Sequence, residues 1–251
     1  SDYFDGDLTA LNGIQVRQPG AAFSQAAWKA MRKIAPGINT DHFAPRADAQ
    51  SLRAELGLSE KKVIVSVGRL VHRKGQDTLI ESMPKILMQI PDAHLLFIGE
   101  GPYKDYLVKR AAELKVSHAI TFIGRIQYDE LPRYICVGDI FAMPSRSRLA
   151  GLEVEGLGIV YLEASACGIA VIGGKSGGAP DAVIDGQTGL VVDGKSTSDV
   201  ARAAVTLLKN PELAKQMGAH GREWIIDEWQ WDRWAAEFNS LLIEDQPFAQ
   251  R

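Results

Sequence analysis

The chain has 251 residues, 46% of them hydrophobic, so it is long enough to bury one large core or two small ones. Its formal net charge of −3, from 28 basic and 31 acidic residues, excludes a global positive field for nucleic acid or an anionic membrane. The sequence has no apolar run of ~18 or more residues and no signal-peptide pattern, so neither a membrane span nor secretion is indicated.

The chain contains two cysteines, Cys136 and Cys167, and both lie in apolar helical contexts. They form no CxxC or Cys/His cluster, and no other stretch has the spacing of metal ligands. We therefore expect two buried thiols in a reducing compartment.

Residues 1–45 are expected to be a lead-in followed by an interdomain connector. The lead-in shows little periodicity apart from a short helix expected near 26–33. Pro36–Gly37 and Pro45 then mark an extended connector. The chain starts with Ser1, and together with this irregular beginning that suggests a fragment or a processed chain.

From Val63 onward, short apolar runs bounded by glycine alternate with segments of helical period. The runs predict six strands, at 63–68, 94–99, 120–124, 139–144, 170–174 and 189–192. Because these runs are apolar throughout, they predict a parallel sheet covered on both faces. We expect a doubly wound, Rossmann-like α/β domain over residues 46–220, with its ligand beyond the carboxyl ends of the strands.

Apolar residues recur at helical spacing from Leu79 to Ile90, with Pro84 predicting a bend, and again from Leu107 to Leu114. Two later helices are expected, one capped near Ser198 and one starting at Asn210–Pro211.

Residues 221–251 are expected to form a C-terminal helical tail rich in tryptophan. It contains Trp224, Trp229, Trp231 and Trp234. These indoles are too many for a solvated helix, so the tail should pack on something. Its own domain and a missing second domain are equally good candidates.

The stretch EGLGIVYLEASACG, residues 155–168, is the strongest candidate site. Gly156 and Gly158 allow close approach of a ligand to the backbone, and the apolar run that follows predicts a helix start with free N–H groups for a diphosphate. Glu155 and Glu163 would lie roughly 12 Å apart at 1.5 Å rise per residue, a span that suits a nucleotide-activated sugar. One carboxylate would accept hydrogen bonds from hydroxyls of the transferred sugar, and the other from hydroxyls of the ribose. The simpler alternative makes Glu155 a dipole partner of the helix and Glu163 a solvated residue.

Cationic side chains follow the first predicted strand in VGRLVHRKGQD, residues 67–77. Arg69 and Lys74 could hold a diphosphate and stabilise the charge that develops as it leaves, with added charge from Arg73. We include Gly68 in the donor-binding set and expect His72 to be solvated. An exposed basic loop is the alternative.

Two further loops are candidates for walls of the site. In GRIQYDE, residues 124–130, the backbone or Tyr128 could meet a base, although a helix cap built on Asp129 is the simpler account of that residue. In GGKSGGAPD, residues 173–181, the glycines could form a second wall before a helix near Pro180, but the P-loop spacing is not matched.

The motifs VGRLVHRKGQD, GEGP, FIGRIQYDEL, FAMPSRSRLAGLEVEGLGIVYLEASACG and SGGAPDAV together resemble the donor-binding half of family 4 retaining glycosyltransferases, which have the GT-B fold. The resemblance covers roughly residues 33–240. Within that family it is greatest to the mycobacterial and corynebacterial mannosyltransferases that build phosphatidylinositol mannosides from GDP-mannose. The family's N-terminal acceptor domain is not recognisable before Lys33, and Asp181 stands where many relatives carry glutamate.

The resemblance assigns roles by position. It implies that Arg69, Lys74 and Glu155 are catalytic, with both cations on the donor diphosphate and Glu155 facing the transferred sugar. Glu163 would bind the ribose hydroxyls. The remaining donor contacts it implies are the amides of Gly158, Ile159 and Val160 for the phosphates, and Arg125, Ile126 and Tyr128 for the base.

The resemblance also implies a reaction that retains the anomeric configuration and needs neither a metal nor another cofactor. The expected substrates are GDP-mannose and a lipid-linked acceptor such as a phosphatidylinositol mannoside, bound through a missing N-terminal domain. The expected location is cytoplasmic, peripheral at the inner face of the cell membrane. Two alternatives stay open: a non-catalytic nucleotide-sugar-binding module or subunit, and a nucleotide-sugar epimerase of the same fold.

Overall fold

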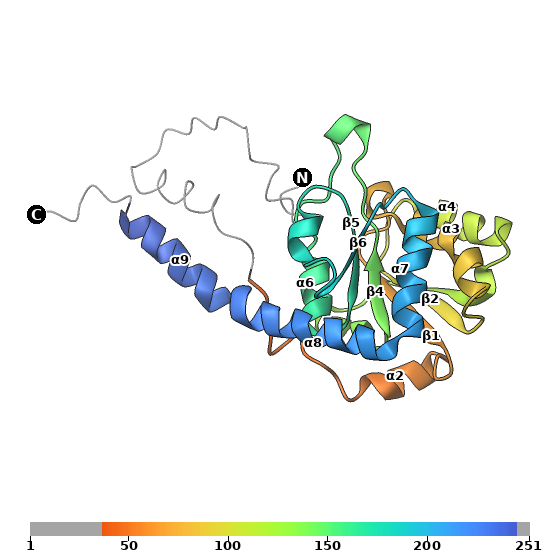
Figure 1. The fold of residues 1–251 in the computed structure, drawn as a ribbon, viewed down its shortest axis with the longest axis horizontal. Helices are drawn as coiled ribbons and strands as arrows, with labels where there is room; N and C mark the ends of the chain where they lie inside the picture. The colour runs from red at the N-terminus through yellow and green to blue at the C-terminus, as the bar shows by residue number, and fades with distance from the viewer. Residues whose placement is uncertain (1–36, 245–251) are drawn as a thin grey trace, which may run out of the picture.

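The computed structural model describes residues 37–244, so the short helix expected near 26–33 lies outside the described residues. Its centre is a parallel sheet with the strand order β3-β2-β1-β4-β5-β6 (Figure 1). The strands are β1 (Lys62–Val67), β2 (Ala93–Ile98), β3 (Ile120–Gly124), β4 (Ile140–Met143), β5 (Val171–Gly174) and β6 (Gly189–Val192). All six predicted strands are confirmed to within one residue at each end. The order is that of a doubly wound, Rossmann-like fold, as expected.

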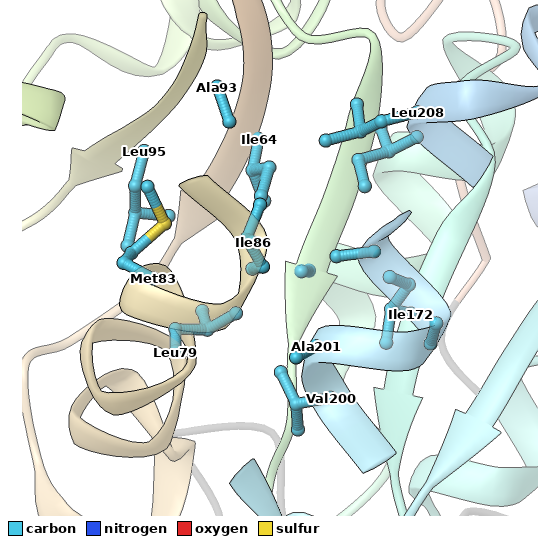
Figure 2. Packing of buried hydrophobic residues seen from close by; sticks show 14 of the residues in the cluster. Ile64, Leu79, Met83, Ile86, Ala93, Leu95, Ile172, Val200, Ala201 and Leu208 are labelled. Carbon is cyan, nitrogen blue, oxygen red and sulfur yellow. The ribbon is translucent and has the colours of Figure 1, made fainter. Parts of the chain in front are cut away.

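Helices cover both faces of the sheet because successive strand residues point to opposite sides. Ile64 and Leu95 face one side, where they pack with Leu79, Met83 and other residues shown in Figure 2. The helices on this face are α3 (Gln76–Leu87), α4 (Lys104–Glu113) and α7 (Thr197–Lys209). The helices on the other face are α2 (Ala49–Glu55), α5 (Leu131–Ile135), α6 (Ile159–Ala166) and part of α8 (Pro211–Glu228). The 3₁₀ helices are η2 (His72–Lys74), η3 (Ser117–Ala119), η4 (Tyr128–Glu130), η5 (Leu149–Gly151) and η6 (Ala179–Ala182).

The helix boundaries follow local capping chemistry. Ser196, not Ser198, caps α7, since its hydroxyl accepts a hydrogen bond from the Asp199 amide at 3.2 Å. The prediction near Ser198 was therefore wrong by two residues. Asn210 caps α8 as predicted, accepting from the Leu213 amide at 3.2 Å, and Pro211 is the first helical residue.

The Trp-rich region consists of the end of α8 and α9 (Trp231–Glu244), which leads away from the sheet in Figure 1. The expected start of the tail at residue 221 falls inside α8, which continues to Glu228. Trp229 is 9% exposed and packs in the cluster that contains Ile38, with Trp224 against it at a ring distance of 5.5 Å. Trp231, by contrast, is 55% exposed. The chain's own domain therefore covers part of this tryptophan group.

Between residues 37 and 244 no helix combines the length and the apolar character needed to cross a membrane.

Candidate functional site

The candidate site lies where the winding of the sheet reverses. β1 pairs with β2 on one side and with β4 on the other, so the segments that follow β1 and β4 turn toward opposite faces. The segment after β1 leads into α3 on one face, and the segment after β4 leads into α6 on the other. Crevices at such switch points, beyond the carboxyl ends of the strands, are the usual ligand sites of this fold.

Lys74 and Glu155 meet at this switch point, one from each segment. The Lys74 ammonium lies 2.9 Å from Oε1 and 2.8 Å from Oε2 of Glu155. The two residues are only 7% and 2% exposed, which is tolerable for charges only when they are paired. An ammonium carries three N–H donors and a carboxylate has about four lone-pair sites, so this pair has capacity for further polar contacts with a ligand.

The glycine-rich segment 173–178 supports the turn that carries Glu155. The Ser176 hydroxyl accepts a hydrogen bond from the Glu155 amide at 3.0 Å. Gly177 has φ +52°, and a Cβ there would overlap the Glu155 carbonyl, so the two backbones are in direct contact. The helix predicted near Pro180 is only the short η6. This segment therefore packs against the turn that carries Glu155 and holds that turn in place.

The start of α6 is shaped by Gly158. Its φ of +75° is a left-handed conformation, and a Cβ would overlap the ring of Tyr161. The Tyr161 hydroxyl donates to the Met143 carbonyl at 2.6 Å, which fixes the helix against the end of β4. Among the described residues no side chain caps α6, so the amides of its first turn, at Ile159 and Val160, are suited to an anionic group.

Glu163 lies inside the protein rather than in solvent. It is 6% exposed, and burial raises its pKa to about 7, an effect that the charge of Lys74 partly offsets. The solvated-helix alternative for this residue is therefore wrong. Lys74 interacts electrostatically with Glu163 while it pairs with Glu155, so one cation serves both carboxylates.

The loop after β3 carries Tyr128, which is 59% exposed and interacts electrostatically with Glu163. The pKa of Tyr128 is raised, first by partial burial and then by the charges of Glu163 and Asp129. Its ring stacks on His42 with centroids 4.6 Å apart, and Nε2 of His42 lies 3.3 Å from the Tyr128 carbonyl. The sequence analysis missed His42, because nothing in the connector stretch NTDHF marks it as a neighbour of this loop.

Other predictions for this loop fare differently. Arg125 is exposed, whereas Ile126 packs against the buried cluster below. Asp129 does not cap a helix: it lies in the first turn of η4, where no described side chain supplies a cap. The predicted cap was wrong because the turn is a 3₁₀ helix that runs directly into α5.

The segment after β1 is held in place by a network that the sequence analysis also missed. Arg146 contacts Asp77 at 2.6 Å and the Thr78 hydroxyl at 2.7 Å, and its amide donates to the Arg73 carbonyl at 2.8 Å. The Tyr103 hydroxyl also donates to Asp77, at 2.9 Å. The only signal in the sequence was an acidic residue in the first turn of a predicted helix, which usually indicates a dipole partner.

Two further cationic candidates lie in this segment: Arg73 is partly buried, and Arg69 is exposed beside Gly68, whose φ is +144°. His72 is exposed as expected, and its ring lies 3.8 Å from that of Tyr103. Within the described range 37–244, no group of three or more His, Cys, Asp or Glu side chains is arranged to hold a metal ion. Cys167 is buried as predicted, but Cys136 is partly exposed, because it caps the short helix α5 rather than lying within it.

The strand order and a polar site at its switch point define a doubly wound, Rossmann-like α/β domain. Comparison with known sequences agrees: the profile of the family described as "Glycosyl transferases group 1" matches residues 48–224. The chain therefore belongs to the glycosyl transferases group 1 family.

Named relatives are similar over nearly all of this chain. The GDP-mannose-dependent alpha-(1-6)-phosphatidylinositol monomannoside mannosyltransferase of Mycolicibacterium smegmatis is 46% identical over 95% of the chain and 62% of its own length. The GDP-mannose-dependent monoacylated alpha-(1-6)-phosphatidylinositol monomannoside mannosyltransferase of Corynebacterium glutamicum is 38% identical over 94% of the chain and 61% of its own length. The chain thus spans about three fifths of these relatives, and the predicted resemblance to mycobacterial and corynebacterial enzymes is confirmed.

A solved structure matches the same unit. The C-terminal domain of a glycosyl transferase group 1 family protein from Francisella tularensis has a TM-score of 0.68 and 25% identity. The match covers 78% of this chain and 100% of that domain. The described fold is thus similar to that of the C-terminal domain of a family member.

Proposed function

We propose that this chain is the donor-binding part of a retaining glycosyltransferase that transfers mannose from GDP-mannose to a lipid-linked acceptor such as a phosphatidylinositol mannoside. The observation that carries the proposal is the convergence of Lys74, Glu155 and Glu163 beside the uncapped start of α6. A cation, two carboxylates and helix amides beyond the carboxyl ends of one parallel sheet match the charge and hydroxyl pattern of a sugar diphosphate.

In this proposal the donor lies along the start of α6. The diphosphate meets the amides of Ile159 and Val160 together with the cations Arg69 and Lys74. As the sugar leaves, negative charge builds up on the diphosphate, and these donors stabilise it more strongly than they stabilise the bound donor. Glu155 accepts hydrogen bonds from the transferred hexose.

The nucleoside end of the donor lies toward Glu163 and the loop after β3. Glu163 accepts from the ribose hydroxyls, and the base lies along the loop that carries Tyr128, whose stacking on His42 offers an aromatic surface. The choice of GDP-mannose is supported by what the mycobacterial and corynebacterial relatives are named for. The proposal places the protein at the cytoplasmic side of the cell membrane, where the lipid-linked acceptor would be reached through a further domain.

Calorimetric titration of the chain with GDP-mannose, UDP-glucose and an ADP-sugar tests the proposal. We expect heat with GDP-mannose, markedly weaker heat with the other two donors, and loss of the signal in Glu163→Ala. A folded protein that binds none of the three donors would refute the proposal.

The second candidate is a nucleotide-sugar-binding subunit without activity of its own. It predicts donor binding without transfer, even at high acceptor concentration. Transfer of radiolabelled mannose to a phosphatidylinositol mannoside by this chain alone would exclude it, and product analysis without acceptor would reveal an epimerase.

A further inference from the structure

Residues that follow β4 fix the backbone on both sides of Lys74. The Arg146 amide donates a hydrogen bond at 2.8 Å to the carbonyl of Arg73, the residue before Lys74. Gly75, the residue after Lys74, has φ +73°, and a Cβ at this position would overlap the Pro144 carbonyl, so the two backbones are in direct contact. The turn η2, which carries Lys74, is therefore fastened to the segment after β4.

The Arg146 side chain fastens the same two segments a second time, at the start of α3. Its Nη2 lies 2.6 Å from Oδ2 of Asp77, and its Nη1 donates to the Thr78 hydroxyl at 2.7 Å. The side chains of Arg146 and Asp77 are only 14% and 12% exposed, so solvent barely screens the pair. The Tyr103 hydroxyl also donates to Oδ2 of Asp77, and the Thr78 hydroxyl donates in turn to the Gly194 carbonyl at 2.8 Å. The guanidinium is thus held at both of its terminal nitrogens.

Two ion pairs therefore join the segment after β1 to the segment after β4. In one, Lys74 of the first segment pairs with Glu155 of the second. In the other, Asp77 of the first segment pairs with Arg146 of the second. The two pairs differ in stiffness, because a lysine ammonium is a point charge on a flexible four-carbon stem, whereas an arginine guanidinium is a planar fork that fixes the direction of its contacts. Arg146 therefore sets where the Lys74 backbone lies, and the position of the ammonium follows from that backbone.

We propose that Arg146 is a positioning residue for the donor diphosphate, because it holds the turn that carries Lys74 at the place from which the Lys74 ammonium reaches the phosphates. This inference rests on the proposed function. Arg146 acts through Lys74 rather than on the donor, since its terminal nitrogens are already committed to Asp77 and Thr78. Small misplacements of a binding group are costly, so affinity for a diphosphate should fall by about tenfold when this support is lost.

The affinities for GDP and GMP separate positioning from a general structural role. The two nucleotides share the base and the ribose, but GDP carries a second phosphate with further negative charge and further acceptor oxygens for a cation. A displaced Lys74 ammonium should therefore weaken GDP binding more than GMP binding. Partial unfolding would instead remove the same fraction of binding-competent protein from both titrations.

Calorimetric titration of Arg146→Lys with each nucleotide provides the test. Lysine keeps the charge opposite Asp77 but cannot bridge Asp77 and Thr78 in a fixed direction. We expect about tenfold weaker binding of GDP and less than about twofold weaker binding of GMP. The double variant Arg146→Met/Asp77→Asn, which leaves neither charge of this pair unpaired, should weaken GDP binding at least as much.

Arg110→Met is the matched control for these titrations. It removes an ion pair of 2.8 Å between α4 and Glu81 of α3, and it should change the affinity for neither nucleotide. Equal losses for GDP and GMP in Arg146→Lys, or no loss for either, would overturn the proposal.

A double-mutant cycle on stability tests the positioning without any nucleotide. If Arg146 positions Lys74, the two residues are coupled, so Lys74→Met should lower the urea midpoint less in the Arg146→Lys background than in the wild type. Additive losses would show that Arg146 does not act through Lys74 and would overturn the proposal. If the wild type binds neither GDP nor GMP, the proposed function fails and the role toward the diphosphate fails with it, whereas the cycle still decides whether Arg146 positions Lys74.

Discussion

At the scale of single residues, the buried pair of Lys74 and Glu155 dominates the site. Each carries a charge that solvent barely reaches, so each depends on the other. The ammonium that is proposed to bind the diphosphate is therefore also required for the native structure, and activity loss alone in a Lys74 variant would be ambiguous.

Stability measurements on Lys74→Met separate these two roles. We expect the variant to lose about 3–5 kcal/mol of unfolding free energy, since it leaves the Glu155 charge buried without a partner. The double variant Lys74→Met/Glu155→Gln should recover most of that loss in urea denaturation, yet still fail to bind GDP-mannose. Lys175→Met, at an exposed lysine nearby, is the matched control and should be nearly neutral. If Lys74→Met and Lys175→Met were equally stable, the native structure would not depend on the ion pair between Lys74 and Glu155.

Glu163 predicts an unusual dependence of stability on pH. Its folded pKa of about 7 lies above the ordinary glutamate value of about 4.3, so the folded state holds the proton more tightly. The contribution of the Glu163 carboxyl to the free energy of unfolding is therefore greatest below about pH 4.3, and it is lost as the pH rises toward 7. The stability of Glu163→Gln relative to wild type should increase by about 1–3 kcal/mol between pH 4.5 and 8. A difference between the two proteins that does not change with pH would rule this out.

The same carboxyl should make donor binding depend on pH. Sugar hydroxyls donate more strongly to a carboxylate than to a neutral acid, so GDP-mannose affinity should rise severalfold from pH 6 to 8. Tyr128 and Cys167 interact electrostatically with Glu163, and the pKa of each is raised above its ordinary value, so neither should ionise in that range in its place. In calorimetric titrations Glu163→Gln should bind more weakly and show a flatter profile. A rise of equal size in the variant would point to another group.

At the scale of elements, the start of α6 depends on Gly158. Both the left-handed φ of +75° and the contact with Tyr161 demand a residue without a Cβ. Gly57 offers a matched control, since its φ is +70° but nothing lies within 4 Å of the position that a Cβ would take.

Gly158→Ala and Gly57→Ala should therefore differ. Each should lose about 1–2 kcal/mol for the left-handed backbone, measured by urea denaturation. Gly158→Ala should lose more, because the methyl group displaces Tyr161, and it alone should weaken GDP-mannose binding. Equal losses in the two variants would mean that the Tyr161 contact is unimportant.

At the scale of the whole molecule, the connector and the Trp-rich helices are fastened together beside the sheet. The Ile38 amide donates to the Trp229 carbonyl at 2.6 Å, and Arg222 reaches the Phe43 carbonyl at 3.3 Å. The segments at the two ends of the described chain thus pack together on the face of the sheet that α6 covers.

Truncation of the buried and the exposed indole should have unequal effects. Trp229→Ala is expected to lower the unfolding free energy by about 3–5 kcal/mol, the usual cost of deleting a large buried side chain. Trp231→Ala should cost under about 1 kcal/mol, because its side chain is mostly in solvent. Thermal denaturation of both variants checks this, and a larger loss at Trp231 would reverse the packing assignment.

Features that depend on neighbouring residues in the sequence could be predicted, whereas contacts between residues far apart in the chain could not. Strands could be predicted to within a residue because a buried parallel strand is a continuous apolar run between glycines. The positions of Lys74 and Glu155 at strand ends were equally predictable, but their direct pairing was not, since it joins residues 81 positions apart. His42 and Arg146 were missed for the same reason. The helix predicted near Pro180 is only a short 3₁₀ turn, because the backbone at Gly177 and Gly178 is in direct contact with the turn that carries Glu155.

The uniform direction of the six strands has a practical consequence. Every strand begins on the rim opposite to Lys74 and Glu155, separated from them by the length of a strand, about 20 Å for six residues. A tether or fluorophore attached beside Lys62 or Asp92 would therefore be fixed at the amino ends of the strands, away from the candidate site. The candidate site would then stay accessible to the proposed nucleotide sugar.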